Sequence, residues 1–205
     1  MAAVGETRVE FIPVTTAADE EILDGVLSRP FSYVSTEGAV WRSAAERLRY
    51  VRDERKSHLL VISDGQPVGA VSWSPGQTPG FFRIGLVSCR DETWTPALVD
   101  RAVRRAMALL TRAAEVQRVE LLAPTYNDVF LEYLTDCAGF EVEGVLRDRF
   151  FLDGRYWPGV VCCADLREFA PQGAVEPAGR QELLDRLRKK ALEDLAHADH
   201  DMWSA

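Results

Sequence analysis

The stretch FFRIGLVSCRDETWTPALVDRAVRRAMA, residues 81–108, decides how the fold of this chain is read. It begins with an apolar run of the length of a buried strand, passes through a polar loop at 89–95 and enters a helical pattern. Thr95 suits the cap of that helix, and Pro96 suits its first position. Because loop amides and the positive end of a helix dipole converge at such a junction, the stretch predicts a phosphate or pyrophosphate site.

The composition indicates one sizeable globular domain followed by a tail. Of the 205 residues, 47% are hydrophobic and 27% are charged, so the core needs no metal or disulfide. The cysteines show no C-x-x-C spacing and are expected to be reduced thiols of a cytoplasmic protein: Cys89, Cys137, Cys162 and Cys163. With no signal peptide and no apolar run of membrane-spanning length, we expect a soluble chain. A net charge of −8 argues against general nucleic-acid binding and favours a cationic or amine-bearing partner.

Periodicity and turn signals predict the α/β class, with a mixed, mostly antiparallel sheet and helices on both faces. Before the deciding stretch we expect strands over 8–14, 59–62 and 68–73 and helices over 16–28 and 43–56, the second with Leu48 and Val51 facing inward. From residue 81 onward we expect strands over 81–87, 119–122, 142–152 and 157–166 and helices over 96–114 and 128–137. Asp64-Gly65 and Asp153-Gly154 mark the hairpin turns.

Residues 1–169 form the predicted domain, 170–179 a linker, and 180–205 a C-terminal amphipathic helix and tail. Apolar residues recur every four positions in that helix, at Leu183, Leu187, Ala191 and Leu195. This narrow stripe suits either docking on the chain's own domain or a dimer contact. Monomer and homodimer therefore both stay open.

The order of elements, with a pyrophosphate-type loop before the third helix, resembles the GNAT superfamily of acyl-CoA-dependent N-acetyltransferases over residues 8–169. The most specific part is GFEVEGVLRDRFFLDGRYWPGVV, residues 139–161. It is similar to the closing hairpin of the ribosomal-protein and antibiotic N-acetyltransferase branch, in its Gly-Phe, its E-G-x-x-R segment and its D-G turn. The resemblance implies a GNAT-like fold and acetyl transfer but does not name the substrate.

The family's loop pattern is Q/R-x-x-G-x-G/A, and here Arg90 is followed by Thr93 and Thr95 where glycines are expected. Their Cβ atoms lie where backbone approaches phosphate in the family. The resemblance implies acetyl-CoA as co-substrate, with a backbone amide near Val87 as donor to the thioester carbonyl. The cofactor-binding residues that it implies are Leu86, Val87, Ser88, Arg90, Thr93, Trp94, Thr95 and Asn127.

Two proton transfers are needed when an amine attacks a thioester. The resemblance places a tyrosine seven residues after Asn127 as the acid for the departing thiolate. That position holds Leu134, and Tyr133 lies one earlier, so a local shift would be needed to bring Tyr133 into place, with Tyr126 in reserve. Glu120 is the candidate base, the alternative being a glutamate paired with an arginine.

The remaining candidates concern binding of the acceptor amine and of the 3′-phosphate end of the CoA donor. Tyr33, Trp41 and Trp73 are expected to line the acceptor pocket, and Arg83 either binds a substrate carboxylate or extends to the surface. Arginines at 101, 104, 105 and 112 form a basic stripe that suits the CoA 3′-phosphate, an RNA backbone or a solvated helix face. No metal site is expected.

These observations favour an N-acyltransferase that moves an acetyl group from acetyl-CoA to a primary amine of a small molecule or protein N-terminus. Because the loop departs from the glycine pattern, two alternatives stay open. One is a transferase with another acyl donor, an aminoacyl-tRNA or a carrier-protein thioester. The other is a non-catalytic GNAT-like binding domain.

Overall fold

The computed structural model describes residues 8–29, 31–136, 139–167 and 169. Its elements, in chain order, are β1 (Val9–Pro13), α1 (Ala17–Leu27), α2 (Ala44–Val51), β2 (Ser57–Ser63), β3 (Gln66–Pro75), β4 (Phe81–Ser88), the short 3-10 turn η1 (Asp91–Thr93), α3 (Pro96–Ala113), β5 (Arg118–Pro124), α4 (Asp128–Asp136), β6 (Phe140–Leu152) and β7 (Arg155–Ala164). Every strand and helix predicted within these residues is confirmed. The predicted linker, the C-terminal helix and Cys137 lie outside them.

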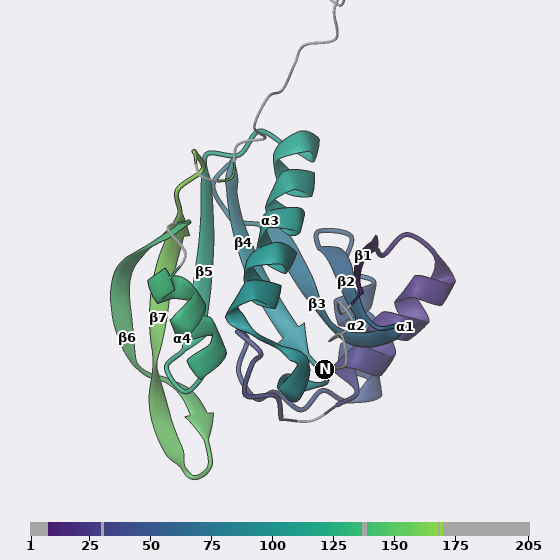
Figure 1. Cartoon of the computed structure of the whole chain (residues 1–205), viewed down its shortest axis with the longest axis horizontal. Helices are drawn as coiled ribbons and strands as arrows, with labels where there is room; N and C mark the ends of the chain where they lie inside the picture. The colour runs from purple at the N-terminus through teal and green to yellow at the C-terminus, as the bar shows by residue number, and fades with distance from the viewer. Residues whose placement is uncertain (1–7, 30, 137–138, 168, 170–205) are drawn as a thin grey trace, which may run out of the picture. The chain divides into compact units, whose positions relative to one another are not determined.

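The strands form one seven-stranded sheet in the order β1-β2-β3-β4-β5-β7-β6 (Figure 1). Five of the neighbouring pairs are antiparallel and the central pair, β4 with β5, is parallel. The predicted mixed, mostly antiparallel sheet is therefore confirmed.

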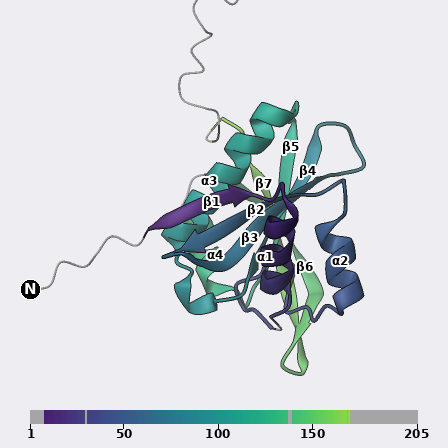
Figure 2. The same cartoon turned by 90° about the vertical axis from the view of Figure 1, so that its right-hand side faces the viewer.

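Helices cover both faces of this sheet (Figure 2). Because side chains of a strand alternate between faces, β2, β3 and β4 each contribute to two apolar clusters. The cluster beside α1 and α2 contains Leu23, Val26, Leu27, Val51, Leu60, Ile62, Ala70 and Val87. On the opposite face, α3 and α4 pack on the larger cluster, which includes Val71, Leu86, Val99, Val103, Met107, Leu121 and Phe130.

The helices begin where side-chain caps satisfy their first amides. Thr16 with Asp19 and Ser43 with Glu46 form complete capping boxes at α1 and α2. Thr95 accepts from the Leu98 amide at 3.2 Å, and Pro96 stands at the first position of α3. The predicted start of the helix after the central strand is confirmed.

Several element bounds and one orientation differ from prediction. The helix α2 ends at Val51 rather than near Lys56, because residues 53–56 close a turn in which the Lys56 amide donates to the Asp53 carbonyl. Val51 is the buried residue of α2, whereas Leu48 is 48% exposed, so the inward orientation predicted for Leu48 is wrong. The strand β7 ends at Ala164, before the predicted residue 166.

The two central strands separate along part of their length. Pairing between β4 and β5 runs from Phe81 with Arg118 to Ile84 with Leu121, and both strands continue beyond it, to Ser88 and Pro124. On its other edge β5 stays paired with β7 as far as Pro124. The sheet therefore opens in its middle, and the candidate site lies at this opening.

Candidate active site

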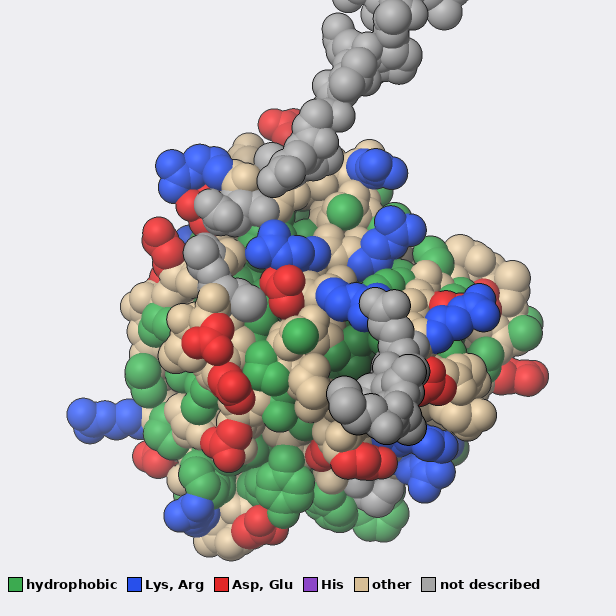
Figure 3. Space-filling model, viewed as in Figure 1, with side chains coloured by type: hydrophobic (Ala, Val, Ile, Leu, Met, Phe, Trp, Pro, Cys, Tyr) green, Lys and Arg blue, Asp and Glu red, His purple; other side chains and the backbone are tan. Residues whose placement is uncertain are grey.

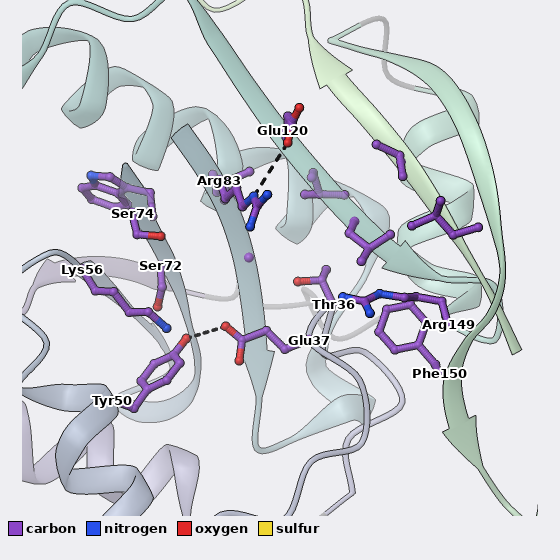
Figure 4. A pocket seen from close by; sticks show the side chains of 17 residues that line it. Thr36, Glu37, Tyr50, Lys56, Ser72, Ser74, Arg83, Glu120, Arg149 and Phe150 are labelled. Carbon is purple, nitrogen blue, oxygen red and sulfur yellow. Dashed lines mark hydrogen bonds and ion pairs between the residues drawn. The ribbon is translucent and has the colours of Figure 1, made fainter. Parts of the chain in front are cut away.

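A cavity of about 540 Å³ lies beside the opening, on the sheet face that carries α1 and α2 (Figure 4). This volume is in the range of small-molecule sites. Its lining comes from the α1–α2 connection, from α2 and the turn that follows it, and from the strands β3 to β7. The charged lining residues are Glu37, Lys56, Arg83, Glu120 and Arg149, and the hydroxyl-bearing ones are Thr36, Tyr50, Ser72 and Ser74.

Gly85 on β4 lets the α1–α2 connection lie close to the strand. A Cβ at this position would stand 3.3 Å from Thr36 Oγ1 and 3.7 Å from Glu37 Cγ. The sequence Thr36-Glu37 therefore forms one wall of the cavity directly above the central strand.

Glu37 is held in that wall by two partners. Tyr50 donates its hydroxyl to Glu37 Oε1 at 2.8 Å, and Arg42 pairs with the other carboxylate oxygen. Burial, reinforced by the Glu37 charge, raises the pKa of Tyr50 far above its usual range, so Tyr50 remains a donor. This carboxylate was missed by the sequence analysis, because it lies in a segment without periodicity.

Glu120 on β5 faces the same cavity from the opposite side. Arg118 donates to Glu120 Oε1 at 2.9 Å, and the Nε of Arg83, its register partner on β4, lies 3.8 Å from Oε2. Arg118 also pairs with Glu143. Glu120 lines the cavity, as a candidate base should, and it is also paired with arginine. Both interpretations of Glu120 therefore agree with the geometry.

The segment Ser32–Thr36, called here the inserted segment, lies along the free edge of β4. The Leu86 amide donates to Thr36 Oγ1 at 2.8 Å, the Thr36 amide donates to the Leu86 carbonyl at 2.9 Å, and the Ser88 amide donates to Ser35 Oγ at 3.0 Å. Asn127, beyond β5, donates its side-chain amide to the Val34 carbonyl at 2.7 Å. Three of the residues expected to bind acetyl-CoA, Leu86, Ser88 and Asn127, are thus brought together, but their hydrogen-bonding groups are bonded to the inserted segment.

The loop after β4 is closed by its own side chains as well. The Asp91 carboxylate accepts from the Ser32 hydroxyl at 2.7 Å, the Tyr33 amide at 2.7 Å and the Ser88 hydroxyl at 2.6 Å. Trp94 is buried, and its indole N–H donates to the Val68 carbonyl at 3.2 Å. The loop predicted to bind a pyrophosphate therefore contains a carboxylate, which is bonded to the end of β4 and to the inserted segment.

Tyr133 lies in the core rather than at the opening. It is 0% exposed and packs edge-on against Phe130 and Phe140, with ring centroids 5.2 and 6.2 Å away. The shift expected to bring Tyr133 into place is not seen, because α4 is one uninterrupted helix and neighbouring residues point about 100° apart.

Tyr126, the reserve candidate, follows the open end of β5. Its hydroxyl accepts from the Ala39 amide at 3.1 Å, and its ring meets those of Tyr33, Phe150 and Trp157. Burial raises the pKa of Tyr126, which keeps its proton in place at neutral pH. Tyr126 is therefore better placed than Tyr133 to meet a ligand at the opening.

The residues predicted for the acceptor are divided. Trp73 and Arg83 line the cavity, whereas Trp41 is 76% exposed and does not. Tyr33 lines a smaller hollow beside Phe151 and donates its hydroxyl to Asp153 at 3.0 Å. Besides Glu37, the lining residues Tyr50, Lys56 and Arg149 were not predicted from the sequence, because periodicity gives no signal for them.

The predicted basic stripe of α3 is exposed, and Figure 3 shows Lys and Arg side chains over this helix. Arg104 pairs with Asp100 at 2.9 Å and lies over the Phe169 ring, and Arg101 lies over the Phe11 ring. These contacts agree with a solvated helix face.

None of the helices in the described residues is long and apolar enough to cross a membrane.

This chain has the fold of the GNAT family acetyltransferases. It is similar to a spermidine N-acetyltransferase from Vibrio cholerae in complex with CoA and spermine, with a TM-score of 0.61, 14% identity and coverage of 78% of this chain and 97% of that one. It is also similar to the Salmonella typhimurium acetyltransferase that modifies the N-terminal serine of ribosomal protein L7/L12 (TM-score 0.58, 14% identity, 77% and 95% covered). A GNAT family acetyltransferase from Streptococcus pneumoniae matches with TM-score 0.58, 15% identity, and 75% and 98% covered. No protein-family model and no curated protein matches the sequence.

Proposed function

We propose that this chain is an N-acyltransferase that moves an acetyl group from acetyl-CoA to a primary amine of a small molecule or a peptide N-terminus. The observation that carries the proposal is the separation of β4 and β5 beside a cavity of small-molecule size. A thioester at the free edge of β4 and an amine in the cavity would meet at this opening. The similarity to acetyltransferases, one of them in complex with CoA, supports the same assignment.

The proposed chemistry needs few groups, because direct attack is mostly positioning. Glu120 takes a proton from the attacking ammonium, and Tyr126 returns one to the departing thiolate. The Leu86 and Ser88 amides, which face away from β3 at the free edge, stabilise the oxyanion that forms on the thioester carbonyl.

The donor can use those amides only after the inserted segment moves. Ser35 and Thr36 accept from both of them, and Asn127 is bonded to Val34. The conformation that binds acetyl-CoA is then a minor state, and the apparent affinity is reduced by its population. An acyl donor on a tRNA or a carrier protein would meet the same obstacle.

A second candidate is a domain that binds its ligand in the cavity and transfers nothing. Two features favour it. The inserted segment already bonds the free edge of β4, and the negative charge of Asp91 in the loop repels a pyrophosphate. In that case the inserted segment is a permanent part of the fold.

Thermal unfolding with acetyl-CoA tests the proposal, with desulfo-CoA as a non-reactive analogue and ATP as a control for phosphate binding. A ligand at 100 times its Kd adds about 2.7 kcal/mol of stability. The double substitution Ser35→Ala, Thr36→Val removes both hydroxyl acceptors and should increase the shift with acetyl-CoA. Thr111→Val, which removes a hydroxyl bonded within α3, is the matched control.

A shift with both CoA compounds and not with ATP, larger in the double variant, supports an acetyl-CoA-dependent transferase. No shift in either protein would overturn free acetyl-CoA as donor and favour the binding domain.

A further inference from the structure

We propose that the ligand of the central cavity is an amine that also carries an anionic group, a carboxylate or a phosphate, seated by Lys56, Arg83 and Arg149. This inference rests on the proposed function for the role of the cavity as acceptor site. It separates the chain from acceptors that carry only positive charge, such as polyamines.

Both carboxylates of the cavity are already neutralised by neighbours. Glu37 is paired with Arg42, and Glu120 accepts from Arg118. Neither of these arginines lines the cavity. The acidic residues therefore do not give the cavity a negative charge.

The cations of the cavity have much less compensation. Lys56 places its Nζ 3.7 Å from the centroid of the Tyr50 ring, and within the described part of the chain neither Lys56 nor Arg149 forms an ion pair. Among the residues that the structure describes, Arg83 forms only the long 3.8 Å ion pair with Glu120. Figure 4 shows these three side chains extending toward the cavity from different elements. The surplus charge facing the ligand is positive.

The fold places Arg149 there by a local irregularity of β6. Its register with β7 passes from Leu146 opposite Gly159 to Phe150 opposite Trp157, and the residues between form a bulge with Asp148 at a φ of 51°. Bulges commonly redirect a side chain next to a site.

The partner strand is adapted to this bulge. A Cβ on Gly159 would lie 2.9 Å from the Phe150 ring and 3.2 Å from Arg149 Cγ. Glycine at this position therefore lets both side chains cross β7 toward the cavity.

The chemistry of the lining fits a ligand with charges of both signs. Guanidinium groups bind carboxylate or phosphate oxygens through paired, charge-assisted hydrogen bonds. The ammonium end would lie toward Glu120 and the opening, where the proposed acyl transfer takes place. A polyamine would instead add positive charge to Lys56 and Arg149.

Calorimetric titration of the full chain, without any acyl donor, tests this with matched pairs. Ornithine is putrescine with a carboxylate added, and phosphoethanolamine is ethanolamine with a phosphate added. We expect the anionic member of at least one pair to bind at least about tenfold more tightly than its partner. The pair that shows this difference identifies carboxylate or phosphate as the anion.

Two variants locate the effect. Arg149→Ala should remove most of the preference, whereas Arg147→Ala, which removes an exposed arginine of the same bulge that does not line the cavity, should keep it. Thermal unfolding checks that both variants fold. Equal effects of the two variants, no tighter binding of the anionic member in either pair, or no binding of any probe would overturn the inference.

The outcomes also separate this inference from the proposed function. Acetyl transfer to putrescine and to ethanolamine in preference to ornithine and phosphoethanolamine would support the transferase and overturn the anionic ligand. Binding of ornithine or phosphoethanolamine with no transfer from acetyl-CoA would do the reverse.

Discussion

His58, at the start of β2, is a buried imidazole beside the cavity. Its Nδ1 lies 2.7 Å from the Ser72 hydroxyl, and its ring lies 5.4 Å from the Tyr50 ring between centroids. Burial, with a contribution from the Lys56 charge, lowers the pKa of His58 to about 4. The folded protein therefore holds His58 neutral where an unfolded chain would protonate it.

The stability of the chain should depend on pH through this residue. Between the unfolded pKa of about 6.5 and the folded pKa of about 4, only the unfolded state gains a proton, so the free energy of unfolding falls as pH falls, by about 3 kcal/mol in total. Above that window the contribution is fully present. Urea unfolding from pH 7 down to 4.5 should show the slope in the wild type and a flatter profile in His58→Gln. Parallel profiles would contradict this assignment.

Tyr126, which follows the open end of β5, and Tyr133, which lies in the core, should behave differently when their hydroxyls are removed. Under the proposed mechanism, Tyr126→Phe lowers kcat about tenfold or more, as expected for loss of a general acid, with little change in acetyl-CoA affinity. Tyr133→Phe keeps its turnover, because the Tyr133 ring is enclosed in the core. Steady-state kinetics of both variants check this. The opposite order would return the role of acid to Tyr133.

At the scale of elements, Asp91 ties the loop after β4 to the inserted segment. Asp91→Ala removes three acceptor contacts and should lower the thermal midpoint and loosen the segment. Glu92→Ala removes the same charge from the same turn at an exposed position. If both variants gain equally in acetyl-CoA affinity, the gain reflects charge; a gain confined to Asp91→Ala reflects release of the segment.

Elements were predictable where their signals are local. Thr16, Ser43 and Thr95 begin helices through contacts within three residues, and the two Asp-Gly pairs turn hairpins with Asp64 and Asp153 at positive φ. Such contacts join residues that are close in the sequence, so the sequence alone indicates them.

The site depends on contacts that are distant in sequence. Thr36 and Leu86 are 50 residues apart, and nothing in either neighbourhood indicates that they bond. Tyr133 shows a related difficulty. A shift of one residue along a helix turns a side chain by about 100°, which decides whether it faces the core or the opening. The bulge that directs Arg149 is likewise a matter of strand register, which alternation alone does not fix.

At the scale of the whole described domain, the sheet consists of β1 to β4 and β5 to β7, joined by the short β4–β5 ladder. Asn127 adds a second connection, because it bonds both the Val34 carbonyl and the Phe130 amide at the start of α4. Asn127 follows β5, whereas the inserted segment lies along β4, so this bond links the two parts of the sheet.

Loss of this connection should affect both stability and the opening. Asn127→Ala should lower the free energy of unfolding by about 2 kcal/mol and speed hydrogen exchange at the Leu86 and Ser88 amides. Thr125→Val removes a nearby hydroxyl that bonds only across to the Pro158 carbonyl of β7. It should leave exchange at those two amides unchanged. Faster exchange in both variants would mean that the opening responds to any weakening of β5.

The inserted segment has a consequence for the behaviour of many copies together. An uncovered strand edge is a template on which another chain can add a strand. In this chain Ser35 and Thr36 occupy that edge with hydroxyl groups and a single amide, which end the hydrogen-bonding pattern instead of extending it. The same few atoms that close the opening therefore protect the molecule from edge-to-edge aggregation. Any variant that displaces the inserted segment exposes the backbone edge of β4 to pairing with another molecule.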